Sequence, residues 1–183
     1  MPDGKTHAAA TVLAAGIAGP VAYFIAGATW ETSLALSVGT MAGLLLSPDL
    51  DVRIGSRSFW LVRHSFGPLV GFFWQWFWQP YARLIPRHRH PLSHSPVIGT
   101  ALRLLYLFLV FGGLYWALRE FWIYIATIIS GAGFLMVDQL GRALPPPPSL
   151  ADLLTWSLFW WAAAGLAIAD ALHTLMDYTW PWQ

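Results

Sequence analysis

The feature that most constrains this chain is a series of long apolar stretches that almost lack charged residues. A helix needs about 20 apolar residues to cross the roughly 30 Å hydrocarbon core of a bilayer. Two such stretches, 7–29 and 33–47, come before a polar segment, and three more, 96–118, 121–140 and 150–178, follow a second polar segment. We therefore expect an all-α membrane protein, a helical bundle of about four to five transmembrane helices.

The composition excludes several other classes of protein. Hydrophobic residues make up 57% of the chain and charged residues 10%, whereas about a quarter of a soluble domain is charged. The length suggests a single domain over residues 1–183. A net charge of +1 gives no argument for a nucleic-acid partner, and because there is no cysteine, His, Asp or Glu must hold any metal ion.

The segment 59–85 is apolar but differs from the spans, because Arg63, His64, Gly67 and Pro68 interrupt it. Its centre reads FFWQWFW at 72–78, and this aromatic density predicts a helix that lies at the interface and contacts membrane lipid. A turn is expected at Arg119 and Glu120, and a stiff connector at the prolines 145–148. Most basic residues fall on the side of the N-terminus, which predicts that this side is cytoplasmic. They are Lys5, Arg53, Arg57, Arg63, Arg83, Arg87 and Arg89.

Four groups of polar side chains stand at the ends of the apolar stretches. They are His7, then Asp49 with Asp51, then His88, His90 and His94, and last Asp170, His173 and Asp177. Because the first two helices run out and back, the first three groups are expected at one face of the membrane. In the last group, His173 and Asp177 are four residues apart on a helix and can bind one cation together. Ionisable residues near a membrane are costly and are often functional.

This combination of side chains predicts a divalent metal site. Imidazole nitrogens and carboxylate oxygens suit zinc, manganese or iron, and one ion needs three or four of them. Seven or eight groups would suit two ions about 4 Å apart, which polarise a phosphoryl oxygen and activate water. Arg89 and Arg103 are candidates for holding a substrate phosphate. Arg103 also needs an anionic partner, because it lies about two turns into a membrane helix.

Each group alone has a simpler interpretation. His7 fits a helix cap, Asp49 and Asp51 fit a capped turn, and the RHRH run at 87–90 fits a basic patch for anionic lipid headgroups. His64 is interpreted as an interfacial residue. One feature opposes convergence: if 96–118, 121–140 and 150–178 all cross the membrane, His173 lies on the far side. The last group then meets the others only if one of these segments does not span.

The chain resembles a known family at several motifs. GKTH at 4–7, SPDLD at 47–51 and HRHPLSHSP at 88–96 are similar to the uncharacterised membrane metal-binding proteins of prokaryotes. These in turn resemble the YdjM-like membrane-bound metal-dependent hydrolases and, more distantly, the helical zinc-dependent phospholipases C. The resemblance implies metal ligands, which are His7, Asp49, Asp51, His88, His94, His173 and Asp177. The chain departs from the family pattern at two positions. A small residue is usual where His90 stands, and an acidic residue often stands where this chain has Ala8.

These observations together predict an integral membrane protein with one or two divalent ions, zinc in the first place, at the cytoplasmic face. The resemblance places it in the inner or thylakoid-type membrane of a prokaryote. As an enzyme it would hydrolyse a phosphoester such as a lipid headgroup, with Asp49 and Arg89 as catalytic residues. The alternative is a non-catalytic, metal-stabilised subunit of a larger membrane complex. A transporter fits less well, because transport sites lie near the middle of the membrane and these side chains cluster at segment ends.

Overall fold

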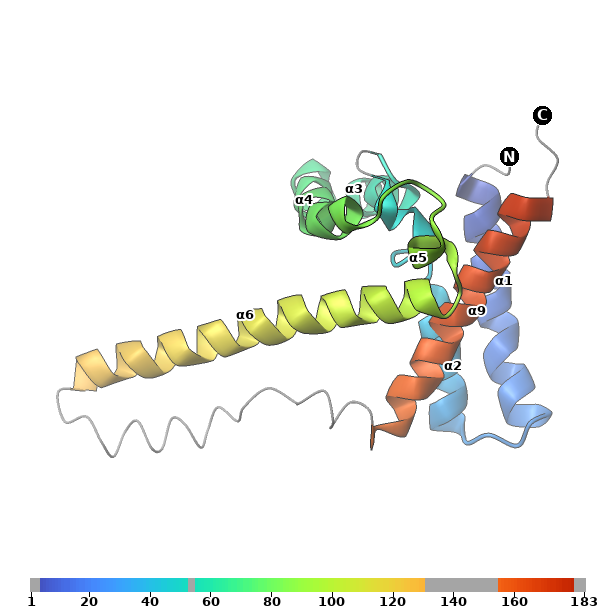
Figure 1. Ribbon diagram of the computed structural model, residues 1–183. Helices are drawn as coiled ribbons and strands as arrows, with labels where there is room; N and C mark the ends of the chain where they lie inside the picture. Colours follow the sequence, from blue (N-terminus) through green and yellow to red (C-terminus); the bar gives the residue numbers. More distant parts are fainter. Residues whose placement is uncertain (1–3, 53–54, 131–154, 180–183) are drawn as a thin grey trace. The chain divides into compact units, whose positions relative to one another are not determined.

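The computed structural model describes residues 4–52, 55–130 and 155–179. All regular secondary structure in these residues is helical, which confirms the predicted all-α fold (Figure 1). The helices are α1 (Gly4–Phe24), α2 (Trp30–Ala42), the 3-10 helix η1 (Pro48–Asp51), α3 (Arg57–Phe66), α4 (Pro68–Leu84), α5 (Pro91–His94), α6 (Ile98–Ser130) and α9 (Ser157–Thr179). The predicted connector at 145–148 lies outside the described residues.

The chain divides into two compact units. One comprises residues 1–103 and 156–183, and the other comprises residues 104–155. The first unit holds every predicted site residue and is built on α1, α2 and α9. In the second unit the described residues belong mainly to the long helix α6. The single domain predicted over 1–183 stays a prediction.

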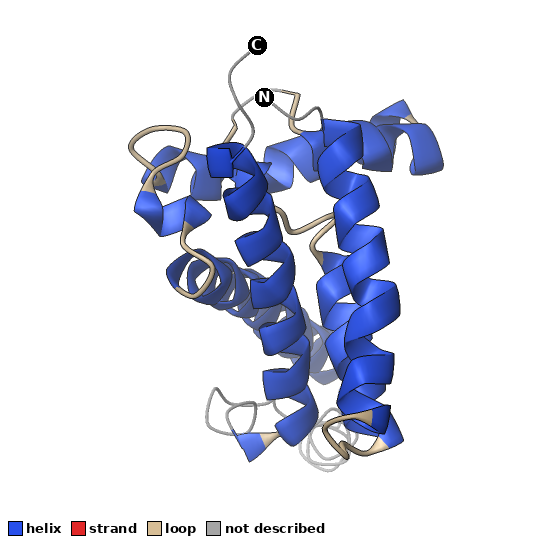
Figure 2. Cartoon of the chain, turned by 90° about the vertical axis from the view of Figure 1, so that its right-hand side faces the viewer, coloured by secondary structure: helices blue, strands red, loops and turns tan. Residues whose placement is uncertain are grey.

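The helices α1, α2 and α9 form a bundle in which α9 runs antiparallel to α1 (Figures 1 and 2). Small residues bring the backbones of α2 and α9 close together. A Cβ atom at Gly39 would overlap the carbonyl oxygen of Ala162, and one at Gly165 would overlap that of Leu36. Because α1 and α9 run in opposite directions, the start of α1 and the end of α9 lie at the same end of the bundle.

Three described helices are long and apolar enough to cross a membrane, and these are 5–24, 98–125 and 157–179. The predicted span 33–47 overlaps α2 (Trp30–Ala42), which has 13 residues and is short for a full crossing. The predicted turn at Arg119 and Glu120 is wrong, because α6 continues through both residues. Arg119 Nη1 donates to Glu120 Oε1 at 2.5 Å, so the two charges pair on the helix surface. The later part of the predicted span 121–140 lies outside the described residues.

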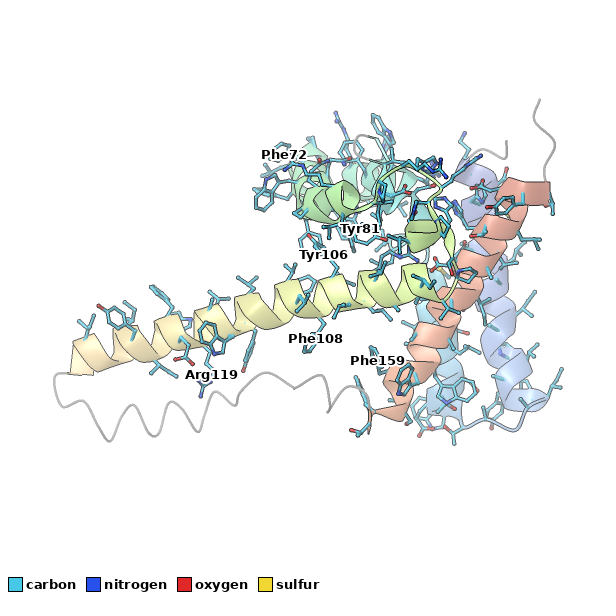
Figure 3. All side chains as sticks on the ribbon, in the orientation of Figure 1. Phe72, Tyr81, Tyr106, Phe108, Arg119 and Phe159 are labelled. Carbon is cyan, nitrogen blue, oxygen red and sulfur yellow. The ribbon has the colours of Figure 1, made fainter. Side chains whose placement is uncertain are left out.

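The aromatic segment 72–78 lies in α4, which follows α3 in a helical hairpin. The hairpin turns at Gly67, whose φ of 93° is a conformation that glycine adopts without strain. One side of α4 packs inward through Trp78 and Tyr81, each 2% exposed. The other side presents Phe72, which projects outward, whereas Tyr81 points to the opposite side of α4 (Figure 3). The position of this helix at a membrane interface stays a prediction.

Candidate metal centre

Four separate segments bring polar side chains to one end of the α1, α2 and α9 bundle. His7 lies in the first turns of α1, and His173 and Asp177 lie in the last turns of α9. The 3-10 helix η1, which begins at Pro48, presents Asp49 and Asp51 just after α2. The short helix α5 ends at His94, and the preceding loop carries His88. The predicted convergence therefore exists in the fold, including the last group of residues.

The centre of this cluster is the carboxylate of Asp177, which three imidazoles surround. Its oxygens lie 3.3 Å from Nε2 of His7, 3.7 Å from Nε2 of His173 and 3.9 Å from Nε2 of His94. Asp49 Oδ1 lies 3.4 Å from Nε2 of His173, and the rings of His7 and His173 stack with centroids 4.1 Å apart. We call these five residues, His7, Asp49, His94, His173 and Asp177, the inner cluster.

The spacing of these ligand atoms is what a divalent cation requires. Bonds of about 2.0–2.1 Å to zinc in a tetrahedral site place neighbouring ligand atoms about 3.3 Å apart, close to the distances above. Among the described residues, neither oxygen of Asp177 nor Nε2 of His94 has a hydrogen-bond partner, although all three atoms are buried. Buried polar atoms are rarely left unsatisfied, and a bound cation would satisfy these three together.

Asp51 and His88 lie on the other side of His94, next to its Nδ1 atom. Asp51 Oδ1 accepts a hydrogen bond from Nδ1 of His88 at 2.8 Å, and Asp51 Oδ2 accepts one from Ser93 Oγ at 2.7 Å. Nδ1 of His94 lies 2.9 Å from Ser93 Oγ and 3.7 Å from Asp51 Oδ2. The structure thus brings all seven predicted metal-site residues together, but in two layers. Within these two layers, three sets of three residues have ligand atoms close enough to bind one ion. They are His7 with His173 and Asp177, Asp49 with His94 and His173, and Asp51 with His88 and His94.

The electrostatic environment favours the forms of these groups that bind a metal. Burial is the main cause that lowers the pKa of His94 to about 4, so its imidazole is neutral at neutral pH. Burial opposes ionisation of Asp49, but the hydrogen bond and charge of His173 outweigh it and hold the pKa of Asp49 below its usual value. His88 is an exception, because its hydrogen bond to Asp51 raises the pKa of the imidazole and so favours the protonated form, which does not bind a metal. A neutral imidazole and an ionised carboxylate are the ligand forms that a divalent cation needs.

The comparison with known families now bears on this cluster. A family described as "Uncharacterized metal-binding protein (DUF2227)" matches residues 2–183, almost the whole chain. The chain belongs to this family. This confirms the prediction of an uncharacterised metal-binding family, while the resemblance to the YdjM-like hydrolases stays a prediction. No curated protein and no solved structure matches the chain.

The prediction that Arg103 holds a substrate phosphate is wrong. The Arg103 side chain is fully buried, forms an ion pair with Asp170 and donates to the Ser93 carbonyl oxygen at 3.1 Å. Thr100 Oγ1 also donates to Asp170. The expected anionic partner of Arg103 is therefore a side chain of the chain itself, and Asp170 belongs to this pair and not to the inner cluster.

The other predicted residues have the following places. Nη2 of Arg89 lies 3.7 Å from Asp177 Oδ1, and its side chain is 26% exposed, at the rim of the inner cluster. Nδ1 of His90 accepts from the Leu92 backbone N–H at 3.2 Å and caps α5, in keeping with its departure from the family pattern. His64 is exposed, and its Nδ1 atom contacts the Trp60 carbonyl oxygen, away from the cluster.

Sequence analysis missed two hydroxyl residues that hold His94. Ser93 joins Asp51 to the imidazole, and Thr174 Oγ1 donates to the His94 carbonyl oxygen at 2.7 Å. Their places in the sequence could have indicated them, because Ser93 directly precedes His94 and Thr174 directly follows His173. The groups that hydrogen-bond to a metal-binding histidine usually fix its orientation.

Proposed function

We propose that this protein is a membrane-embedded, divalent-metal-dependent hydrolase of phosphoesters, with its metal centre at the cytoplasmic face. The observation that carries the proposal is the convergence of three Nε2 atoms and two carboxylates in one mostly buried cluster with an arginine at its rim. Membership of a metal-binding family supports the metal, and zinc is the first expectation because the ligands are imidazoles and carboxylates. The residues that would hold it are those of the inner cluster.

A bound divalent cation supplies a Lewis acid that polarises a phosphoryl oxygen and lowers the pKa of water. The chain's own residues then have separable tasks. Arg89 binds phosphate oxygens, because its planar guanidinium at the rim matches their geometry. Asp49 is more exposed than Asp177, with side chains 22% and 5% exposed, so it is the carboxylate that water reaches, and it accepts the proton of the attacking water. His7, His94, His173 and Asp177 would hold the cation, and their burial limits the access of solvent.

Membrane embedding is part of the proposal, and the apolar helices support it. The outer sides of the candidate spans are apolar, with Leu13 and Leu175 more than half exposed. Because α9 runs antiparallel to α1, the end of α9 lies on the same side as the start of α1. The arginines of 57–89 then lie on the same side as the metal centre, which the positive-inside rule makes cytoplasmic. A lipid headgroup at that surface is the first substrate to test.

The test uses the full chain purified in detergent. We expect bound zinc or another divalent metal by elemental analysis, and hydrolysis of bis(4-nitrophenyl) phosphate and of phosphatidylglycerol in mixed micelles. A chelator should abolish turnover and added zinc should restore it. His173→Ala should lose both metal and turnover, Arg89→Ala should keep the metal and raise KM, and His64→Ala, a matched control outside the cluster, should change neither. Metal-free protein that hydrolyses at the wild-type rate would refute the proposal.

A second function is favoured by the burial of the ligands. His7, His94, His173 and Asp177 are each at most 9% exposed, as in a closed structural metal site. The protein would then be a metal-stabilised subunit of a larger membrane complex. Metal-loaded protein that hydrolyses neither phosphodiester, and that unfolds when the metal is removed, would support this function over the first.

A further inference from the structure

The second layer of polar groups behind His94 has a role that differs from metal binding. We infer that Asp51 and Ser93 are positioning residues that fix His94 in one tautomer, with Nε2 directed at the cation, and that Asp51 is not itself a ligand. The inference rests on the proposed metal centre but does not require hydrolysis. It changes the sequence-based assignment of Asp51, which counted this carboxylate among the ligands.

The hydrogen bonds around Ser93 determine the tautomer. The Ser93 hydroxyl has one hydrogen and three neighbours: Asp51 Oδ2 at 2.7 Å, Nδ1 of His94 at 2.9 Å and the His90 carbonyl oxygen at 3.0 Å. A carboxylate oxygen is the strongest and nearest acceptor, so the hydrogen points to Asp51. The Ser93 oxygen can then only accept from His94, which places the proton on Nδ1. The lone pair of His94 is therefore on Nε2, the atom that faces Asp177.

The Asp51 carboxylate is occupied by this arrangement. Its side chain is fully buried, and its two oxygens accept hydrogen bonds from His88 and Ser93. To bind a cation together with His88 and His94, it would have to give up these bonds, and His94 would have to offer Nδ1 in place of Nε2. A carboxylate that holds the far nitrogen of a metal-binding histidine is a common arrangement, and its loss typically costs 10–100-fold in metal affinity.

The backbone of the same segment is held from two other helices. Arg103 of α6 donates to the Ser93 carbonyl oxygen and Thr174 of α9 donates to the His94 carbonyl oxygen. Gly99 permits this approach, because a Cβ atom there would overlap the Ser93 carbonyl oxygen. The main chain of His94 is thus fixed independently of Asp51 and Ser93. Substitutions of these two side chains should therefore act on the imidazole and leave the fold of the segment intact.

The test is the binding of Co²⁺ to the full-length, metal-free protein in detergent, followed by its visible absorption spectrum. Asp51→Asn has one carbonyl oxygen and so keeps only one of the two hydrogen bonds. We expect it and Ser93→Ala to bind the same number of Co²⁺ ions as the wild type, 10–100-fold more weakly, with the d–d bands at the wild-type wavelengths. Asp49→Asn, which alters a proposed ligand, should shift those bands. Thermal unfolding of each metal-free variant reports whether it is folded.

The outcomes separate this inference from the proposed function. If Asp51→Asn loses one equivalent of Co²⁺ or shifts the bands as Asp49→Asn does, Asp51 is a ligand and the inference is overturned. Wild-type affinity in both Asp51→Asn and Ser93→Ala would overturn it as well. If the wild type binds no Co²⁺, the metal centre itself fails. If binding follows the expectation but no phosphodiester is hydrolysed, the inference stands and the proposed catalysis falls.

Discussion

The buried ion pair between Arg103 and Asp170 should dominate the stability of the unit that holds the metal centre. Both side chains are fully buried, Thr100 donates a hydrogen bond to Asp170, and Arg103 donates one to the Ser93 carbonyl oxygen. Removing one partner leaves the other charge buried without compensation, which typically costs about 3–5 kcal/mol. We therefore expect Arg103→Met and Asp170→Leu each to lower the free energy of unfolding by about that amount.

The double variant distinguishes this explanation from a simple loss of packing. With both charges removed, no buried charge is left unpaired, and apolar replacements of buried ion pairs are often neutral or stabilising. Arg103→Met combined with Asp170→Leu should therefore recover most of the loss, giving a coupling free energy of at least about 2 kcal/mol. Arg119→Met is the matched control, because its pair with Glu120 is partly exposed and such pairs contribute about 0–1 kcal/mol.

The assay is thermal unfolding in detergent with a chelator present, because bound metal would stabilise the folded state and hide the difference. A loss of 3–5 kcal/mol corresponds to a fall in Tm of about 6–20 °C for a chain of this size. Single variants that unfold within about 2 °C of the wild type would refute the reasoning. So would a double variant whose loss equals the sum of the two single losses.

Three further predictions follow from individual contacts. His7→Ala should remove most of the bound metal and His64→Ala none, as elemental analysis of the purified variants would show. Gly39→Ala should lower the Tm, because its Cβ overlaps the backbone of α9, whereas Gly16→Ala, with nothing within 4 Å of its Cβ, should raise stability by about 0.5–1 kcal/mol. The pKa of His94 is lowered to about 4, so the unfolded imidazole takes up a proton first. The free energy of unfolding of the metal-free protein should therefore fall between about pH 6.5 and 4, by at most about 1.4 kcal/mol per pH unit, and His94→Gln should lose this slope.

The helices could largely be predicted because their signal is local. The runs 7–29 and 150–178 correspond to α1 and α9, with ends that shift by several residues. The error at Arg119 and Glu120 has a physical reason. Both residues are good helix formers, no glycine or proline lies between Gly113 and Gly131, and opposite charges side by side can satisfy each other. A charged pair in an apolar run indicates a turn only when residues that break helices support it.

The partners of each polar residue could not be predicted, because they depend on contacts between distant segments. The sequence indicates that Arg103 needs an anion, but Asp170 lies 67 residues away, and its helical spacing groups it with His173 and Asp177. Asp170 lies only three residues before His173, but its carboxylate pairs with Arg103 and Thr100 of α6. Spacing along one helix shows which side chains share a face, and only the packing of the neighbouring helix determines which of them meet.

The meeting of His7 with His173 depends on the number of times the chain reverses between them. Counting 96–118 and 121–140 as two separate helices directs the last helix away from His7, and the expected far-side placement of His173 followed from that count alone. Among the described residues, α6 is one helix from 98 to 130. The helix α9 runs antiparallel to α1, and this direction brings the ring of His173 against that of His7. Residue types and spacing can therefore name candidate ligands of such a centre, while the direction in which α9 packs against α1 decides whether those side chains can meet.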